Sequence, residues 1–320
     1  MASAPIGIVG KLPALADFVR LGASSELFQS LLTWLLDAVQ RSTSTRRDWL
    51  EAVAPGRVDA LVYRQRGGTS VLAGALSPSA DSVGRRFPVA AAAELPLPPE
   101  FLEHPEVLPL LLERVWAITG GLVHDLQSLD RASVEAGRFG VEMELSGADA
   151  LETYRTWTKE IATLDFVELV FDGAIDRAAR ALALAQEAVR PYRGVENPDT
   201  PLSLRLPLGR AGGAAVCFWL DVVKRLAGWR HTVPSFFWSH DGEQGALLLH
   251  LGRPPTVALA ELWLPSGRCD EVCDLILPDS GAWHTESIDV WQGVLGEPQD
   301  CVSDLLRVAE GGGPRPVRVG

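Results

Sequence analysis

The sequence has 320 residues, of which 47% are hydrophobic and 22% charged, and a formal net charge of −12. This composition excludes a globally disordered chain, and the negative charge disfavours nonspecific binding to nucleic acid. Four cysteines in a chain of this length do not make a disulfide framework. The sequence contains no run of about 18 uncharged apolar residues, so we expect no membrane span. The first ten residues lack the charged head and apolar run of a secretion signal, so we expect a cytoplasmic protein with reduced cysteines.

Charge is unevenly distributed along the chain. Residues 1–99 carry a net charge of +2, whereas residues 239–310 carry −10. An acidic C-terminal face would favour a basic partner and disfavour an anionic membrane, although the same charges would also serve solubility alone.

The N-terminal third predicts strands around one long helix. Ser24 and Ser25 are typical helix N-caps, and apolar side chains recur at helical spacing after them. Gly67 and Gly68 supply the backbone freedom that a hairpin turn requires. The elements expected here are a strand at 6–10, a helix at about 24–40, hairpin strands at 58–63 and 69–76, and an internal strand at 88–93.

The rest of the chain predicts longer helices and a second hairpin. A helix is expected at 105–129, interrupted at Gly120 and Gly121 because two glycines cost roughly 2 kcal/mol of helix propensity. Residues 191–201 are the best candidate for a linker or long loop. The other expected elements are strands at 139–145 and 203–207, helices at 149–163, 176–189, 214–226 and 302–309, and hairpin strands at 232–239 and 246–251 joined through Asp241 and Gly242.

Strands and helices alternate without a regular βαβ order. This pattern predicts an α/β fold with a mixed sheet and helices on both faces, plus a C-terminal α+β extension. We expect an N-terminal domain at 1–135, a C-terminal α/β region at 136–310 that could pack with it as one unit, and a disordered tail at 311–320.

Two segments of the sequence resemble motifs of a known protein family. Residues 7–20 read GIVGKLPALADFVR, and residues 74–88 read GALSPSADSVGRRFP. In this order and separation they resemble the TagF family, also called ImpM, of accessory proteins of bacterial type VI secretion. A weaker match is SFFWS at 235–239. The resemblance covers about residues 6–130 and departs from the family pattern at Ala16, where glycine is usual and a positive φ would strain alanine.

The resemblance implies a fold, a function and a partner. The family fold is expected to be a three-layer α/β/α sandwich, which agrees with the mixed sheet predicted from the residues. TagF-like proteins are expected to repress type VI secretion post-translationally by binding the forkhead-associated scaffold protein of the system. The chain is therefore predicted to be a noncatalytic regulator rather than an enzyme.

The second motif offers groups for turns and for ion pairs. Ser79 and Asp81 can accept hydrogen bonds from backbone N–H groups, and the guanidinium groups of Arg85 and Arg86 can pair with carboxylates or phosphates. Three roles stay open: a rigid connection with a buried ion pair that fixes the first turn, a surface for a partner or ligand, and a catalytic site. The candidate partner-binding or motif residues are Lys11, Asp17, Arg20, Ser79, Asp81, Arg85, Arg86 and Trp238, and Asp17 and Arg20 would share a face if their segment were helical.

Other residues with reactive side chains do not form recognisable sites. Lys11 follows a glycine, but the spacing of a P-loop is absent. Cys269 and Cys273 lack the spacing of a zinc site, and His231, His240 and His250 need not converge. Six of the ten tryptophans follow residue 210, which predicts either a Trp-rich core or a binding surface. We expect no cofactor and no metal.

Two other functions stay open. A phosphate-ester hydrolase or phosphotransfer enzyme would use Asp17, Asp81 and Arg85 to position phosphate. A structural component of the secretion baseplate would instead co-purify with assembled complexes.

Overall fold

The computed structural model describes residues 2–143, 146–239, 245–266, 269–276, 285–297 and 300–311. Its strands are β1 (Ala2–Gly10), β2 (Val19–Leu21), β3 (Asp59–Tyr63), β4 (Ser70–Ser77), β5 (Val89–Pro96), β6 (Gly140–Met143), β7 (Leu202–Pro207), β8 (Ser235–Ser239), β9 (Ala246–Leu251) and β10 (Val272–Asp274). Its helices are α1 (Glu26–Thr45), α2 (Pro99–Glu103), α3 (Leu108–Asp125), α4 (Arg131–Ala136), α5 (Gly147–Glu160), α6 (Thr163–Phe171), α7 (Ile175–Val189), α8 (Gly213–Ala227), α9 (Ala258–Trp263), α10 (Thr285–Leu295) and α11 (Val302–Ala309).

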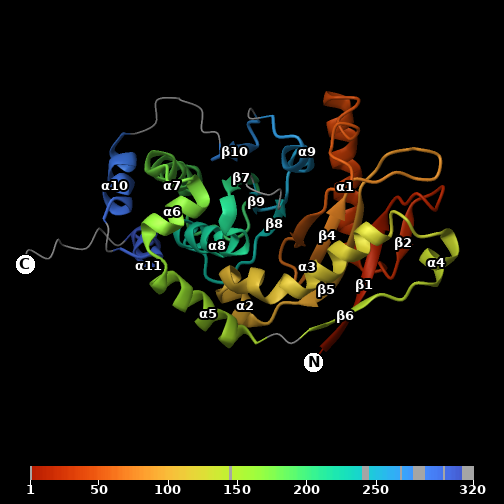
Figure 1. The fold of residues 1–320 in the computed structure, drawn as a ribbon, viewed down its shortest axis with the longest axis horizontal. Coiled ribbons are helices and arrows are strands. Elements are labelled where there is room, and N and C mark those ends of the chain that lie inside the picture. Colours follow the sequence, from red (N-terminus) through yellow and green to blue (C-terminus); the bar gives the residue numbers. More distant parts are fainter. Residues whose placement is uncertain are drawn as a thin grey trace, which may run out of the picture.

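Within these residues one sheet of ten strands runs through the molecule, with helices on both faces (Figure 1). The strand order is β10-β7-β9-β8-β3-β4-β5-β1-β2, and β6 pairs with β1. Strands β10 and β7 are parallel, and the other pairs are antiparallel. The predicted α/β sandwich with a mixed sheet is confirmed.

The C-terminal strands continue the sheet of the N-terminal domain. Strand β8 pairs with β3 in the register Asp59↔Ser239 to Val62↔Phe236. The predicted C-terminal α+β extension is therefore part of the same sheet, because the backbone groups of β3 that β4 leaves unpaired bond to β8. The predicted hairpin turn at Asp241 and Gly242 lies outside the described residues, as do residues 312–320 of the predicted tail.

Helices α1 and α9 cover one face of the sheet. Helix α1 begins at the predicted N-cap, where Ser25 Oγ accepts a hydrogen bond from the backbone N–H of Phe28 at 3.4 Å. Its Trp34 ring stacks on Phe237 of β8 with centroids 5.1 Å apart, and the indole N–H donates to the carbonyl of Pro254 at 3.0 Å. A helix of the N-terminal domain thus packs directly on C-terminal strands.

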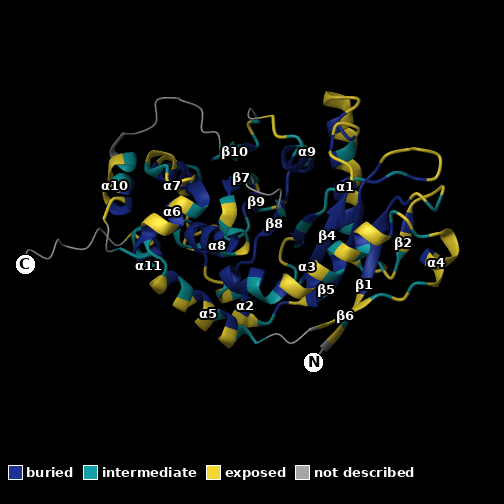
Figure 2. Cartoon of the chain, in the orientation of Figure 1, coloured by how far each residue is buried: buried dark blue, intermediate teal, exposed yellow. Residues whose placement is uncertain are grey.

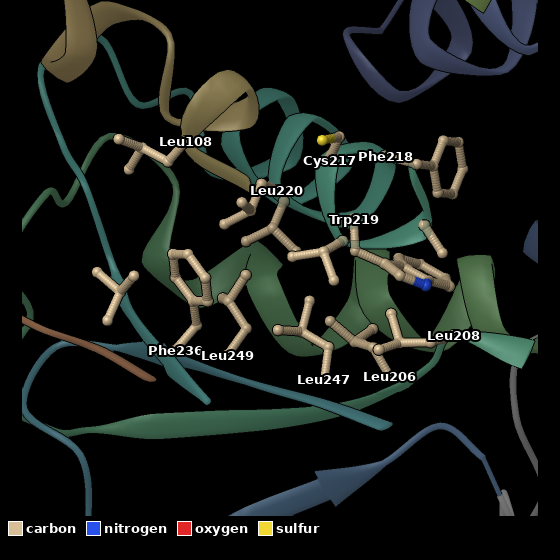
Figure 3. Close-up of a cluster of buried hydrophobic side chains, with 14 of the residues drawn as sticks. Leu108, Leu206, Leu208, Cys217, Phe218, Trp219, Leu220, Phe236, Leu247 and Leu249 are labelled. Carbon is tan, nitrogen blue, oxygen red and sulfur yellow. The ribbon is translucent and has the colours of Figure 1, made fainter. Parts of the chain in front are cut away.

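The opposite face is covered by α3 and, in the C-terminal region, by α8. In Figure 3, side chains of β7, β8 and β9 point toward α8, which contributes Cys217, Trp219 and Leu220. The Trp219 indole N–H donates to the carbonyl of Pro207 at 2.7 Å. Burial follows these layers, since the strands are buried and the outer helix faces are exposed (Figure 2). Many of the C-terminal tryptophans therefore belong to the core.

Helix α3 continues through Gly120 and Gly121, so the predicted interruption is wrong. The helix packs along β4 and β5 and buries Leu112, Val115 and Trp116. This packing outweighs the low helix propensity of the two glycines. The segment from Pro105 to Asp125 is long and apolar enough to cross a membrane by length and composition, a test that core helices also pass.

The helix predicted at 149–163 is α5, which ends at Glu160, and α6, which begins at Thr163, is a separate helix that the sequence did not predict. Ile161 and Ala162 have extended backbones between them, and Ala162 forms an isolated β-bridge with Cys301. A contact with a residue far along the chain thus lies at the boundary between the two helices.

Candidate functional site

The first motif forms a turn that is fixed by a glycine. Gly10 ends β1 with a φ of +129°, and a Cβ built there would lie 2.1 Å from the carbonyl oxygen of Pro88. Only glycine fits this approach, since other residues rarely adopt the conformation and a side chain would collide with backbone. The chain then turns so that the Lys11 side chain points into the protein, where it is 8% exposed.

The second motif meets Lys11 at the carboxylate of Asp81, whose side chain is fully buried. Lys11 Nζ and Arg85 Nε each donate to Asp81 Oδ2 at 2.7 Å. The backbone N–H groups of Val83 and Arg85 donate to Oδ1 at 3.1 and 2.8 Å. We call Lys11, Asp81 and Arg85 the Asp81 cluster. Its four donors occupy the acceptor positions of the carboxylate.

The hydrogen bonds of the cluster keep the Asp81 carboxylate ionised. Burial works against ionisation, but the hydrogen bonds from Lys11, Arg85 and Val83 outweigh it and hold the pKa of Asp81 well below its ordinary value. Lys11 Nζ also lies 5.2 Å from the centroid of the Phe18 ring, within the range of a cation–π contact.

The cluster joins the two motifs to each other. Arg85 donates through Nη2 to the carbonyl of Ala16 and lies 3.9 Å from the Asp17 carboxylate. The backbone N–H of Ser82 donates to the carbonyl of Leu15 at 2.9 Å. Ala16 has no positive φ, so replacement of the usual glycine strains nothing at this turn.

Above the cluster lies an exposed surface made by both motifs. Phe18 is 44% exposed and Val83 is 67% exposed, which is high for side chains of this kind. The side chains of Asp17, Arg85 and Arg86 are at least half exposed around them. We call these five residues the Phe18–Val83 surface.

The remaining candidates lie at the edge of this region or away from it. Ser79 Oγ donates to Gln127 Oε1 at 3.1 Å just after α3, and Arg86 Nε lies 4.0 Å from Glu51. Arg20 lies in β2 and donates to Gln29 at 2.9 Å. Since the segment from Asp17 to Arg20 is not helical, the shared helical face does not form.

Trp238 belongs to the core rather than to the motif region. It lies in β8, where its ring meets Trp116 of α3 with centroids 3.9 Å apart and stacks on Phe236 at 6.1 Å. The weak third motif thus provides aromatic packing under α3.

Sequence reasoning missed the pairing of Lys11 with Asp81. The available signal was a lysine, a residue type that occurs only three times in the sequence, placed directly after the uncharged segment at 6–10. Since a buried ammonium group requires an acceptor of opposite charge, Lys11 needed a carboxylate partner, and the second motif contains one.

The described histidines and cysteines do not form a metal site. No group of three or more His, Cys, Asp and Glu side chains within the described ranges is placed to hold a metal ion. His231 is exposed and His250 is fully buried, whereas His240 lies outside the described residues.

Comparison with known proteins places the N-terminal part of this chain in a family. Residues 7–131 match the TagF N-terminal domain, which is described as type VI secretion system-associated. The chain therefore carries a TagF N-terminal domain over these residues, and a link to type VI secretion rests on that domain. Both motifs and both sides of the Asp81 cluster lie inside this match.

Comparison with solved structures and with curated proteins gives no further information on the function of this chain. The crystal structure of PA0076 from Pseudomonas aeruginosa PAO1 is 17% identical, with a TM-score of 0.38, and the match covers 82% of this chain and 96% of that one. A likeness this distant carries no information on function. No curated protein matches the chain.

Proposed function

We propose that this protein is a noncatalytic, cytoplasmic regulator that represses type VI secretion post-translationally by binding the forkhead-associated scaffold protein of the system. The Phe18–Val83 surface is the proposed contact. The observation that carries the proposal is that the two motifs contain two kinds of side chain, one buried and one exposed. Their buried groups bond to each other in the Asp81 cluster, while apolar and basic side chains beside them face solvent.

The composition of the surface suits protein recognition. An aromatic ring and arginine guanidinium groups contribute strongly to binding energy at interfaces. Arg86, half exposed and only 4.0 Å from Glu51 at its nearest, also presents donors in a geometry that matches carboxylates and phosphates. A partner surface with an apolar patch and acidic or phosphorylated side chains would be complementary.

The geometry argues against phosphoryl transfer by Asp17, Asp81 and Arg85. The Asp81 carboxylate already accepts four hydrogen bonds from the chain and is closed to solvent, so a phosphate or metal would have to displace Lys11 or Arg85. The side chain of Asp17 is 98% exposed and lacks the buried setting that activates a catalytic carboxylate.

The direct test is isothermal titration of the full chain with the purified forkhead-associated protein, phosphorylated and unphosphorylated. We expect saturable 1:1 binding in the micromolar range or tighter for at least one form. A preference for the phosphorylated form that is lost in Arg86→Gln would indicate that Arg86 contacts phosphate. Absence of binding to both forms, with both proteins shown to be folded, would contradict the proposal.

A further inference from the structure

A cavity of about 860 Å³ lies between the N-terminal domain and the C-terminal region. Its walls come from the start of α1, the end of β3, the loop at 196–199, the segment at 229–235 and the end of β9. This volume is within the range of small-molecule sites in proteins. No residue of the first two motifs lines it, and the weak third motif contributes Ser235.

The buried histidine His250 lines this cavity and lacks a full set of hydrogen bonds. It lies in β9 with no exposed surface, and its Nδ1 is 2.7 Å from Ser203 Oγ. Among the described residues no partner reaches its Nε2. A buried polar atom without a partner is costly, so Nε2 indicates a place where something outside the chain supplies the missing hydrogen bond.

His250 is neutral in the folded protein, because burial lowers its pKa to about 3. Its ring therefore offers Nε2 as either an acceptor or a donor, depending on which nitrogen carries the proton. The Phe237 ring lies edge-on to it with centroids 5.1 Å apart and fixes its orientation from one side.

Two arginines that line the cavity have no carboxylate within salt-bridge distance among the described residues. Arg64 is half-buried and is held by the carbonyls of Gly68 and Val233, both at 3.1 Å. Arg253 follows β9 and is exposed at the mouth.

The cavity carboxylates have other partners or face solvent. Asp199 pairs with Arg66. Glu196 accepts hydrogen bonds from the backbone N–H groups of residues 230 and 231 at 3.2 and 3.0 Å, and these bonds hold its pKa low against the opposing effect of burial. Glu26 is exposed at the start of α1. The positive charge available to a ligand is therefore that of Arg64 and Arg253.

We propose that this cavity binds a small organic anion. A phosphate or carboxylate group of the ligand would pair with Arg253 and Arg64, and a neutral polar group would complete the hydrogen bonds of His250 Nε2. The hydroxyl groups of Tyr63 and Ser30, which lie 2.9 Å apart on the cavity wall, offer further polar contacts. Since the walls come from both parts of the chain, the ligand would link the TagF N-terminal domain to the C-terminal region.

The test is isothermal titration of the full chain with adenosine monophosphate and with citrate as probes of the phosphate and carboxylate forms of the anion. We expect saturable 1:1 binding of at least one probe, and the probe that binds distinguishes the two chemistries. Arg253→Gln should weaken that binding at least tenfold. The matched control is Arg47→Gln, because Arg47 is an exposed arginine that does not line the cavity.

A second readout follows His250 itself. In long-range ¹H–¹⁵N spectra the bound probe should shift the Nε2 resonance of His250, and His250→Gln should weaken binding if it folds. No binding of either probe at millimolar concentration, or equal weakening by the Arg47 variant, would overturn the proposal and leave water as the partner of Nε2. Arg253 is exposed, so its variant tests the cavity even if the His250 variant fails to fold.

Discussion

The Asp81 cluster and the His250 cavity both contain buried polar groups, but they differ in whether the chain itself supplies the partners. Asp81 accepts four hydrogen bonds from its own motifs, whereas His250 Nε2 has no partner among the described residues. Buried groups that are satisfied internally fix a structure, and buried groups that are not satisfied point to a ligand or water. The buried part of the first two motifs therefore stabilises the fold. The buried polar atom without a partner, His250 Nε2, lies outside those motifs.

The largest expected effect comes from Gly10, which holds the turn on which the Asp81 cluster depends. Gly10→Ala would place a Cβ 2.1 Å from the Pro88 oxygen at a φ of +129°. We expect a loss on the order of 4 kcal/mol or more in the free energy of unfolding, measured by urea denaturation. The control is Gly121→Ala, where no atom lies within 4 Å and helix propensity predicts a gain of about 1 kcal/mol. Equal stabilities of the two variants would contradict the geometry.

The second largest effect is expected for Asp81→Asn, which leaves the buried Lys11 ammonium group without its counter-ion. The melting temperature should fall by several degrees, since removing one partner of a buried pair is strongly destabilising. Asp17→Asn, at an exposed carboxylate, should leave it nearly unchanged. A melting temperature equal to that of the wild type would show that Asp81 does not hold Lys11 in the fold.

Asp81 also predicts the direction of acid sensitivity. Its pKa is lower in the folded protein than in the unfolded chain, so its contribution is fully present above the unfolded value of about 4 and is lost as the pH falls through the folded pKa. Denaturation between pH 5 and pH 2 should therefore be less steeply pH-dependent for Asp81→Asn than for the wild type. Identical slopes would argue against an ionised Asp81 in the folded state.

His250 gives a smaller effect at milder pH. Its folded pKa of about 3 lies below the unfolded value of about 6.5, so the unfolded chain takes up a proton first and stability falls as the pH drops from 6.5 toward 3. The loss between pH 7 and pH 5 should be about 2 kcal/mol and should disappear in His250→Gln. His231→Gln, at an exposed histidine, is the control. An unchanged pH dependence in His250→Gln would place the titrating group elsewhere.

Local sequence signals predicted much of the fold. The N-cap at Ser25, the hairpin turn at Gly67 and Gly68, and the alternation of strands and helices were sufficient for α1, for β3 with β4, and for the α/β class. The continuation of the sheet from β3 to β8 was not predicted, because the pairing joins residues more than 170 positions apart and leaves no local pattern.

The candidate site was predictable in its residues but not in its contacts. The motifs identified Lys11, Asp81 and Arg85, yet the pairing of Lys11 with Asp81 depends on the turn that Gly10 makes against Pro88. His250 gave no usable signal, because a single histidine in an apolar strand looks the same whether its Nε2 is satisfied or not.

The most direct test of the account is a binding titration with Val83→Asp. Val83 is exposed, and it bonds to the Asp81 carboxylate through its backbone N–H, which the substitution keeps, so stability should stay within about 0.5 kcal/mol of the wild type. Binding to the forkhead-associated protein should weaken at least tenfold, whereas Val290→Asp, at an exposed valine in α10, should bind as the wild type does. Normal binding by a folded Val83→Asp protein would contradict the assignment of the Phe18–Val83 surface as the contact.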